Sequence, residues 1–322
     1  AGKAVVVIPV DGTIDLGLAP FIDRVVKESA KDEIAAVVLD INTFGGRVDA
    51  AVRIKDSLLG SAVPTVAFVN RRAISAGALI SLACDVIAVT SGATMGAATP
   101  VQMGGGGGQA QPVAEKVVSY MRKEMRSSAE AKGRDGDLAE AMVDADHNVP
   151  GLAPEGKLLT LTTDEGLEHG MFDLRAESFD ELLERLGLEG APVRRATVNW
   201  AERVARFLTD PTVSGMLMTF GFLGLLMELY TAGFGITGII GLSCLFLFFL
   251  GHVVSHLAGW EELMMLLAGL ALVLLELVGL GGGTGLLGIA GMAAIIVSLN
   301  ASARTRGELD AGPPAYLPVD AR

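Results

Sequence analysis

A serine at the start of a predicted helix, Ser75, occupies the position in this chain that best suits nucleophilic chemistry. It follows an apolar run at residues 65–69 and a short polar turn, and it opens a stretch of small residues with helical periodicity. An N-cap serine accepts a hydrogen bond from a free amide of the first helical turn. A nucleophilic serine instead uses those amides and the positive end of the helix dipole to stabilise an oxyanion. Both roles are open at this point.

A nucleophilic serine needs a general base, and histidine is the first residue type to consider. The chain has four histidines. His252 and His256 lie in or beside an apolar C-terminal region, whereas His147 precedes a loop and His169 falls in a late helix. None has a positional relation to Ser75, so a Ser-His-Asp triad is poorly supported. A desolvated lysine with a lowered pKa is a recognised alternative base.

Alternating apolar and amphipathic segments surround Ser75 and must position it. The patterns predict strands at residues 4–10, 34–41, 65–69, 85–89 and 94–98, helices at 16–31 and 48–59, and a turn at 42–46. Such alternation with short connections predicts an α/β domain whose strands are mostly parallel. Functional groups are then expected at the strand ends and in the turns.

Five consecutive glycines, Gly104–Gly108, come before a predicted long helix. Such a run does not fix one conformation by itself, so it is either a spacer or a flap beside a cleft. The helix is expected to begin at Pro112 and to end near Lys132, where Gly133 follows. Further helices and a strand are expected through residues 137–188.

The C-terminal part of the chain has the composition of a membrane domain. The chain has 322 residues, of which 51% are hydrophobic, and no Lys or Arg lies between Arg206 and Arg304. Each of four apolar segments is close to the roughly 20 residues that cross a bilayer; they lie near 212–230, 234–252, 261–279 and 284–300. The formal charge of -12 therefore falls mainly on residues 1–210 and the tail, which argues against a nucleic-acid partner.

Two further features mark this region. Residues 197–209 place apolar side chains on one side of a helix and arginines elsewhere, a pattern typical of a helix in the membrane interface. An internal repeat then puts Glu228 and Glu276 each before a glycine-rich turn, which predicts two helical hairpins. Intramembrane carboxylates are often functional. Because these two lie near span ends, we favour a structural role, capping the turn or joining helices or subunits.

The motifs around Ser75 resemble a known superfamily. Residues 41–46, Ile-Asn-Thr-Phe-Gly-Gly, followed by Ser75-Ala76-Gly77, resemble the Clp-type peptidase and signal-peptide-peptidase superfamily, with Phe44 where a proline is usual. More specifically, residues 96–101, the glycine loop, Lys116 and residues 131–135 resemble the membrane-bound long-form NfeD proteins, the stomatin-operon partner proteases. The resemblance covers essentially the whole chain. It implies a Clp/crotonase-like ββα domain followed by an α-helical multi-span membrane domain.

The resemblance also implies the site residues. It assigns the nucleophile to Ser75 and the general base to Lys116, as a Ser-Lys dyad. It assigns the oxyanion hole to the N–H groups of Gly46 and Ala76, with Gly45 allowing a close backbone approach. No cofactor and no metal are expected.

The implied function is that of a membrane-anchored serine endopeptidase that cleaves apolar peptide segments, including those of a stomatin/flotillin-like (SPFH) partner. The expected partners are therefore a stomatin/flotillin-like membrane protein, the peptide substrate, the lipid bilayer and further copies of the chain. A membrane scaffold that assembles with an SPFH protein, with weak or silent protease activity, is the alternative. A crotonase-like acyl-CoA enzyme would share the fold, but it explains neither Lys116 nor the membrane region.

The expected organisation is a protease domain at 1–190, a linker with an interfacial helix at 191–210, about four transmembrane helices at 211–301 and a polar tail at 302–322. We expect a multi-pass protein of the cell (inner) membrane. Arginines flank the apolar region on both sides and by themselves favour an inside location for both flanks. We nevertheless expect an extracytoplasmic protease domain, because the family usually carries a signal peptide and because large domains translocate with little regard to flanking charge.

Overall fold

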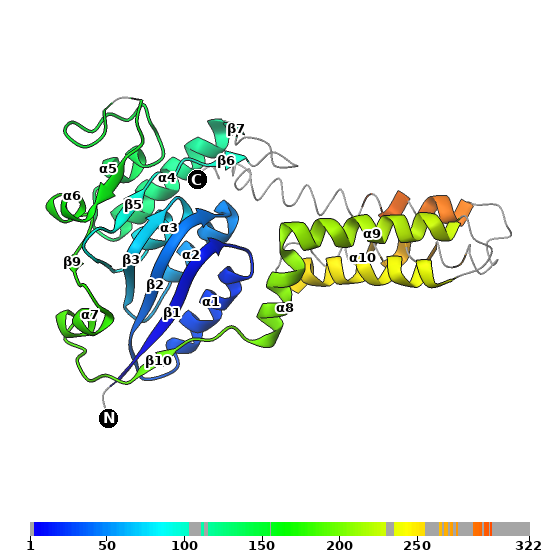
Figure 1. The fold of residues 1–322 in the computed structure, drawn as a ribbon, viewed down its shortest axis with the longest axis horizontal. Coiled ribbons are helices and arrows are strands. Elements are labelled where there is room, and N and C mark those ends of the chain that lie inside the picture. Colours follow the sequence, from blue (N-terminus) through cyan, green and yellow to red (C-terminus); the bar gives the residue numbers. More distant parts are fainter. Residues whose placement is uncertain are drawn as a thin grey trace, which may run out of the picture. The chain divides into compact units, whose positions relative to one another are not determined.

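The chain divides into two compact units, Ala1–Val198 and Asn199–Arg322. The computed structural model describes residues 3–102, 111, 112, 115–154, 156–229, 235–254 and short stretches between 264 and 297. The first unit combines a sheet with helices, and the described part of the second unit is helical (Figure 1). The predicted order, an α/β domain followed by a helical C-terminal region, is therefore confirmed.

A predominantly parallel sheet forms the centre of the first unit. Its strands run in the order β10-β1-β2-β3-β4-β9, and every neighbouring pair along this path is parallel, as predicted. These strands are β1 (Ala4–Ile14), β2 (Ile34–Gly46), β3 (Thr65–Ile74), β4 (Val86–Val89), β9 (Leu174–Arg175) and β10 (Val193–Arg195). Beyond β4, β5 (Thr94–Gly96) also pairs with β3, and β8 (Thr160–Thr162) runs antiparallel to β5.

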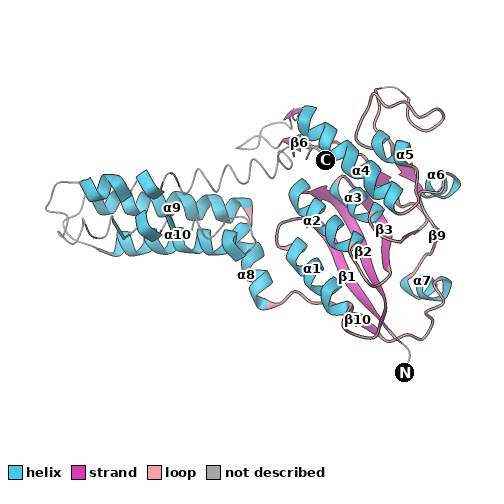
Figure 2. Ribbon diagram, turned by 180° about the vertical axis from the view of Figure 1, so that it is seen from behind, coloured by secondary structure: helices cyan, strands magenta, loops and turns pink. Residues whose placement is uncertain are grey.

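Helices cover both faces of this sheet (Figure 2). The neighbours α1 (Leu18–Ser29), α2 (Val48–Leu59) and α3 (Ala76–Leu82) pack against one another and against β1, β2 and β3. On the other face, Leu182 and Leu183 of α7 (Phe179–Arg185) join a core with alternate residues of the strands, among them Val38 and Phe68. Strands buried on both faces account for the continuous apolar runs in the sequence.

Two strands extend beyond their predicted ends. The predicted turn at residues 42–46 is wrong, because β2 continues to Gly46, and β3 likewise continues to Ile74. The reason is pairing: β1 stays in register with β2 as far as Ile14 opposite Gly46, and the Arg47 amide donates to the Ile14 carbonyl at 2.8 Å. Ladder hydrogen bonds outweigh the tendency of two glycines to form a turn.

The glycine-rich run, Gly104–Gly108, lies outside the described residues, so neither interpretation of it is tested. The strands on either side of it, β6 (Val101–Gln102) and β7 (Gln111–Pro112), pair antiparallel as a separate two-stranded sheet. The helix predicted from Pro112 begins slightly later, as α4 (Glu115–Ala131). The chain then continues through α5 (Gly136–Ala141) and α6 (Thr163–Glu168).

The turn after α4 holds a buried arginine. Arg134 is only 6% exposed, and its guanidinium donates to the Cys84 carbonyl at 2.9 Å, to the Asp85 carbonyl at 3.1 Å and to the Asp173 carboxylate at 2.7 Å. Asp135 follows it and caps α5 by accepting a hydrogen bond from the Asp137 amide at 2.7 Å. The motif at residues 131–135 thus connects α4 and α5 to the β4 and β9 region of the sheet.

In the second unit, α9 (Pro211–Leu229) and α10 (Ile236–Val254) form a closely packed helical hairpin. A Cβ atom placed on Gly241 would lie 2.9 Å from the Gly221 carbonyl oxygen, so only glycine permits this approach. The carboxylate of Glu228 accepts hydrogen bonds from the Gly238 amide at 2.7 Å and from the Thr237 hydroxyl and the Gly235 amide. Glu228 therefore caps the first turn of α10.

The first two apolar segments that the sequence predicts as membrane spans correspond to α9 and α10. Among the described residues, no single helix combines the length and the hydropathy of a span, but α8 (Trp200–Thr209) and α9 together do so across a bend of 69°. The predicted third and fourth apolar segments, Glu276 and the tail at 302–322 lie wholly or largely outside the described residues.

The Arg134 contacts generate a stability prediction. Arg134→Met would remove the donor to two buried carbonyls and one of two donors to the part-exposed Asp173 carboxylate, which keeps the Ile87 amide. We expect it to lower the free energy of unfolding by about 2–4 kcal/mol. Thermal or urea unfolding of the detergent-solubilised chain, followed by circular dichroism, measures the change. Arg185→Met is the matched control, because Arg185 forms an exposed pair with Glu181 and its loss should cost no more than about 0.5 kcal/mol. Equal effects of the two substitutions would contradict the assigned role.

A second prediction concerns acid stability. Hydrogen bonds from Arg126 and then Lys123 outweigh burial and hold the pKa of the Glu140 carboxyl at about 2, against an ordinary value of 4.5. Between these two values the unfolded chain binds the proton and the folded chain does not, so stability falls as the pH falls. We expect urea midpoints to drop between about pH 5 and pH 3, and Glu140→Gln to reduce that drop. The exposed Glu189→Gln is the control, and an equal reduction of the drop by this substitution would contradict the assignment to Glu140.

Candidate functional site

Ser75 lies in a strained turn between β3 and α3. Its backbone has φ 56° and ψ -120°, a left-handed conformation that non-glycine residues seldom adopt. Although Ser75 is the N-cap residue of α3, its side chain makes no capping hydrogen bond. The capping role that the sequence left open is therefore excluded. A serine on a sharp, strained strand-to-helix turn is instead the arrangement that presents a nucleophilic hydroxyl.

Hydrogen bonds on both sides of Ser75 enforce this conformation. The Ser75 amide donates to the Gly96 carbonyl of β5 at 3.0 Å, and the Ser75 carbonyl accepts from the Ala78 amide of α3 at 2.9 Å. The backbone of Gly96 packs closely against that of Leu159, because a Cβ atom on Gly96 would lie 2.4 Å from the Leu159 carbonyl oxygen. The chain therefore leaves the sheet and enters the helix within one residue.

Gly45, at the end of β2, gives the Ser75 side chain its space. A Cβ atom on Gly45 would lie 2.6 Å from the Ser75 Cβ atom and 3.1 Å from its Oγ atom. The Gly45 amide donates to the Thr43 hydroxyl at 2.9 Å, and that hydroxyl donates to the Gly12 carbonyl at 2.5 Å. Thr43 thus joins β1 to the strand end beside Ser75. The sequence places Thr43 in the predicted turn at residues 42–46 and gives no signal of this role, because Asp40 and Asn42 are polar as well.

Two backbone amides lie next to this contact. Gly46 is in register with Ile14 of β1, and the Ile14 carbonyl takes its hydrogen bond from Arg47. In a parallel ladder the N–H group of the residue in register then points to the opposite side of its strand, in this case away from β1. Ala76 is the first residue of α3, and amides of a first helical turn have no partner within the helix.

Lys116 lies in the first turn of α4, and its side chain is exposed. No hydrogen bond between described residues joins it to Ser75. Each of the neighbouring lysines on or beside α4 is instead engaged by carboxylates. Lys123 pairs with Glu140, and Lys132 pairs with Asp85 at 2.6 Å.

A third lysine, Lys55, is buried against α4. Its ammonium lies 2.7 Å from Asp56 and 2.6 Å from Glu124. Burial acts to lower the pKa of Lys55, but the two carboxylates outweigh it and the net effect is a raised pKa. An ion-paired ammonium resists deprotonation. Of these four lysines, Lys116 is the candidate base because the ion pairs between described residues include the other three and not Lys116.

The histidines are placed elsewhere in the described structure. His169 ends α6 and is exposed, and His252 lies inside α10, where its Nδ1 atom is 2.7 Å from the Phe248 carbonyl oxygen. No described contact relates either ring to Ser75. Within the described residues, no group of three or more His, Cys, Asp or Glu side chains is arranged to hold a metal ion.

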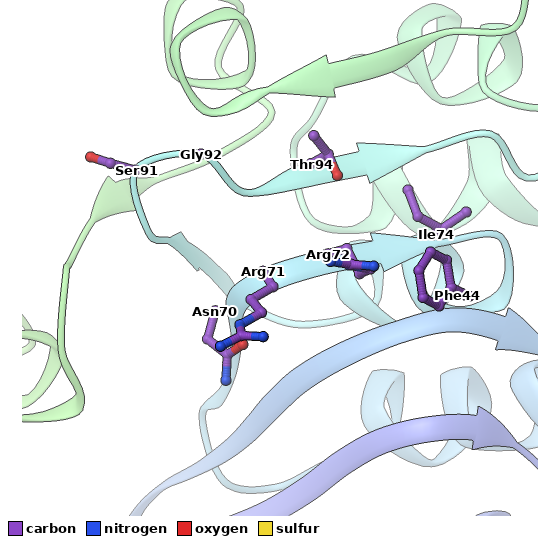
Figure 3. A pocket seen from close by; sticks show the side chains of 8 residues that line it. All are labelled: Phe44, Asn70, Arg71, Arg72, Ile74, Ser91, Gly92 and Thr94. Carbon is purple, nitrogen blue, oxygen red and sulfur yellow. The ribbon is translucent and has the colours of Figure 1, made fainter.

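A groove of about 540 Å³ lies beside the strand ends (Figure 3). Phe44 is 73% exposed at its edge, and the Arg72 guanidinium lies 4.4 Å from the centre of its ring. Phe44 precedes Gly45 in the chain, and the groove residue Ile74 precedes Ser75, but Ser75 itself does not line the groove. The full lining consists of Phe44, Asn70, Arg71, Arg72, Ile74, Ser91, Gly92 and Thr94.

Two solved structures of one protease have a fold similar to that of this chain. A mutant of the 1510-N membrane-bound stomatin-specific protease, in complex with a substrate peptide, aligns with a TM-score of 0.55 and 24% identity. The alignment covers 65% of this chain and 99% of that one. A second mutant of the same protease gives a TM-score of 0.53 at 24% identity and covers 62% and 100% of the two chains. These matches support the fold of the α/β unit.

Two curated relatives are similar in sequence. The chain is 39% identical over 298 residues to Membrane protein NfeD1b of Bacillus subtilis (strain 168). The alignment covers 92% of this chain and 66% of that protein. It is 25% identical over 248 residues to Membrane-bound protease PH1510 of Pyrococcus horikoshii. That alignment covers 71% of this chain and 54% of the relative. The chain therefore spans only part of the length of either relative.

Family models match both units. Residues 4–196 match the NfeD1b N-terminal domain, and residues 212–317 match the NfeD integral membrane domain. The first match alone covers more than half of the chain. With one domain matched across the α/β unit and the other across the apolar helices, the chain belongs to the NfeD family of membrane proteins.

Proposed function

We propose that this protein is a membrane-anchored serine endopeptidase in which Ser75 is the nucleophile and Lys116 the general base. The observation that carries the proposal is the strained backbone of Ser75, whose hydroxyl is not used to cap α3. A chain keeps such strain where surrounding contacts enforce it, and functional sites are where it concentrates. The sequence relation to a membrane-bound protease agrees with this assignment.

The proposed reaction is acyl transfer. The Ser75 Oγ atom attacks the carbonyl carbon of a peptide bond while the uncharged Lys116 amine takes the hydroxyl proton. The tetrahedral intermediate collapses, the C–N bond breaks, and the ammonium returns the proton to the leaving amine. Water, activated by the same amine, then attacks the acyl-enzyme and releases the carboxylate product.

The amides of Gly46 and Ala76 are the proposed oxyanion donors. Gly46 directs its amide away from β1, and Ala76 begins α3 beside Ser75. Loss of one such donor typically lowers kcat by about 10²–10³-fold. Gly45 contributes room rather than a donor, because its own amide is bonded to Thr43.

We propose apolar peptide segments as substrates and a stomatin/SPFH-type membrane protein as the partner that supplies them. Phe44 and Ile74, the chain neighbours of Gly45 and Ser75, offer apolar surface in the groove. The relative 1510-N is described as stomatin-specific and has been solved with a substrate peptide. We also propose that the protein resides in the cell (inner) membrane, crosses it about four times and associates with further copies of itself. In this proposal the α/β unit lies on the extracytoplasmic side.

The dyad is tested by substitution in the full chain. Ser75→Ala and Lys116→Ala should each lower kcat/KM for an apolar test peptide by about 10³-fold or more, because each removes a group from one catalytic unit. A fluorophosphonate probe should label Ser75 in the wild type and nothing in Ser75→Ala. Lys123→Ala is the matched control on the same helix and should retain activity, since Lys123 is paired with Glu140.

Retained cleavage in Ser75→Ala would overturn the proposed nucleophile, and retained cleavage in Lys116→Ala would overturn the base. A wild-type chain that cleaves neither the peptide nor a co-expressed stomatin-like protein, yet co-purifies with that protein, would favour the scaffold alternative. Circular dichroism of every variant establishes that the fold is preserved.

The groove generates a separate prediction about substrate binding. Phe44→Ala removes an exposed aromatic surface beside the serine while leaving the backbone of Gly45 in place. We expect KM for an apolar peptide to rise roughly 5- to 20-fold with kcat little changed. Leu158→Ala, at a half-exposed leucine that does not line the groove, should leave both constants unchanged. A fall in kcat without a change in KM would contradict a binding role for Phe44.

A further inference from the structure

The helix α8 (Trp200–Thr209) is the first element of the second unit. Neither family model includes it, because one match ends at residue 196 and the other begins at 212. Its two sides nevertheless differ strongly in polarity, and its large apolar side chains face outward.

Three large apolar side chains of α8 are exposed. Trp200 is 78% exposed, Val204 44% and Phe207 62%. The spacing of these residues, four and then three positions, places them in one stripe along the helix. An exposed stripe that contains two aromatic residues is costly in water, since apolar area removed from water stabilises by about 25 cal/mol per Å².

Contacts within the second unit fix the orientation of α8. Leu208 is buried, and a Cβ atom on Gly251 of α10 would lie 2.5 Å from the Leu208 Cβ atom. A capping box starts the helix: the Glu202 amide donates to Asn199 at 2.8 Å, and the Asn199 amide donates back to Glu202 at 2.7 Å. The stripe is therefore held by a formed helix that is docked on α10.

The end of α8 sets its direction. Asp210 separates it from α9 and accepts a hydrogen bond from the Thr212 amide at 2.9 Å, so a new helix begins at once. The two helices meet at 69°. If α9 stands along the bilayer normal, α8 lies about 20° from the membrane plane, and the usual range of helix tilt accommodates such an angle.

The charges of α8 agree with this placement. At about 100° of rotation per residue, Arg203 lies some 60° from the centre of the apolar stripe. Its side chain is exposed. Arginine beside an apolar stripe can bury its methylene groups and keep its guanidinium at lipid phosphates. Glu202 lies on the far side of the helix, away from the stripe.

We propose that α8 is an in-plane membrane helix whose stripe, Trp200, Val204 and Phe207, is embedded at the boundary between the lipid headgroups and the acyl chains. Arg203 contacts lipid phosphates from the edge of the stripe. The occupant of this surface is thus the bilayer that holds α9 and α10. The inference does not depend on peptidase activity, and its two rivals are a deep, bent span made of α8 and α9 and a protein surface that covers the stripe.

Tryptophan fluorescence tests the depth of Trp200. The chain has two tryptophans, Trp200 and Trp260, so Trp260→Phe in the full chain leaves Trp200 as the sole reporter. The protein is reconstituted in vesicles of phosphatidylcholine and phosphatidylglycerol that carry bromine either near the headgroup or near the chain end. We expect bromine near the headgroup to remove at least about half of the Trp200 emission, and bromine near the chain end clearly less.

Two results would overturn the proposal. Stronger quenching by bromine near the chain end would place α8 deep in the bilayer, as part of a bent span with α9. Emission at the wavelength of tryptophan in water, or unquenched emission at any wavelength, would mean that protein or solvent covers the stripe. The emission difference between the wild type and Trp200→Phe reports the same depth without the Trp260 substitution, so failure of that variant to fold does not prevent the test.

Discussion

The contact between Gly45 and Ser75 is the constraint on which the site depends. Two strand ends approach so closely that a Cβ atom on Gly45 would lie 2.6 Å from that of Ser75. This approach requires β2 to remain a strand to Gly46, which in turn requires β1 to continue beside it to Ile14. Thr43 fixes the arrangement by bonding both to β1 and to the Gly45 amide. The strained Ser75 backbone is the consequence, because the chain must turn into α3 within the space that remains.

The helices and strands of this unit follow from local patterns, and the site does not. Residues 48–59 predict α2 with the bounds that the structure has, since its apolar periodicity and its flanking residues agree. The strand ends at Gly46 and Ile74 depend instead on pairing between segments about thirty residues apart, and single-segment propensity contains no such information. Ser75 could be identified as a residue of interest from its place before a helix. Its backbone conformation could not, because it results from the Gly96 and Gly45 contacts together.

Charge distribution explains how one lysine differs from its neighbours. Lys55, Lys123 and Lys132 each meet a carboxylate, and these pairs attach α4 to the rest of the α/β unit. A helix attached in this way can present its first turn while the remainder acts as support. The sequence alone places Lys123 and Lys132 on or near one helix and Lys55 on another, and only the fold shows which of them are engaged. The proposed base is thus the α4 lysine that takes no part in these described pairs.

The capping of α10 by Glu228 bears on how the second unit enters a membrane. Its carboxylate is fully buried and takes its hydrogen bonds from the first residues of the next helix. A carboxylate without these donors is costly to move into hydrocarbon, whether it is charged or neutral. The end of α9 is therefore compatible with the bilayer only after the start of α10 has formed beside it. If α9 and α10 both cross the bilayer, this contact favours joint insertion of the two helices over stepwise release of single segments.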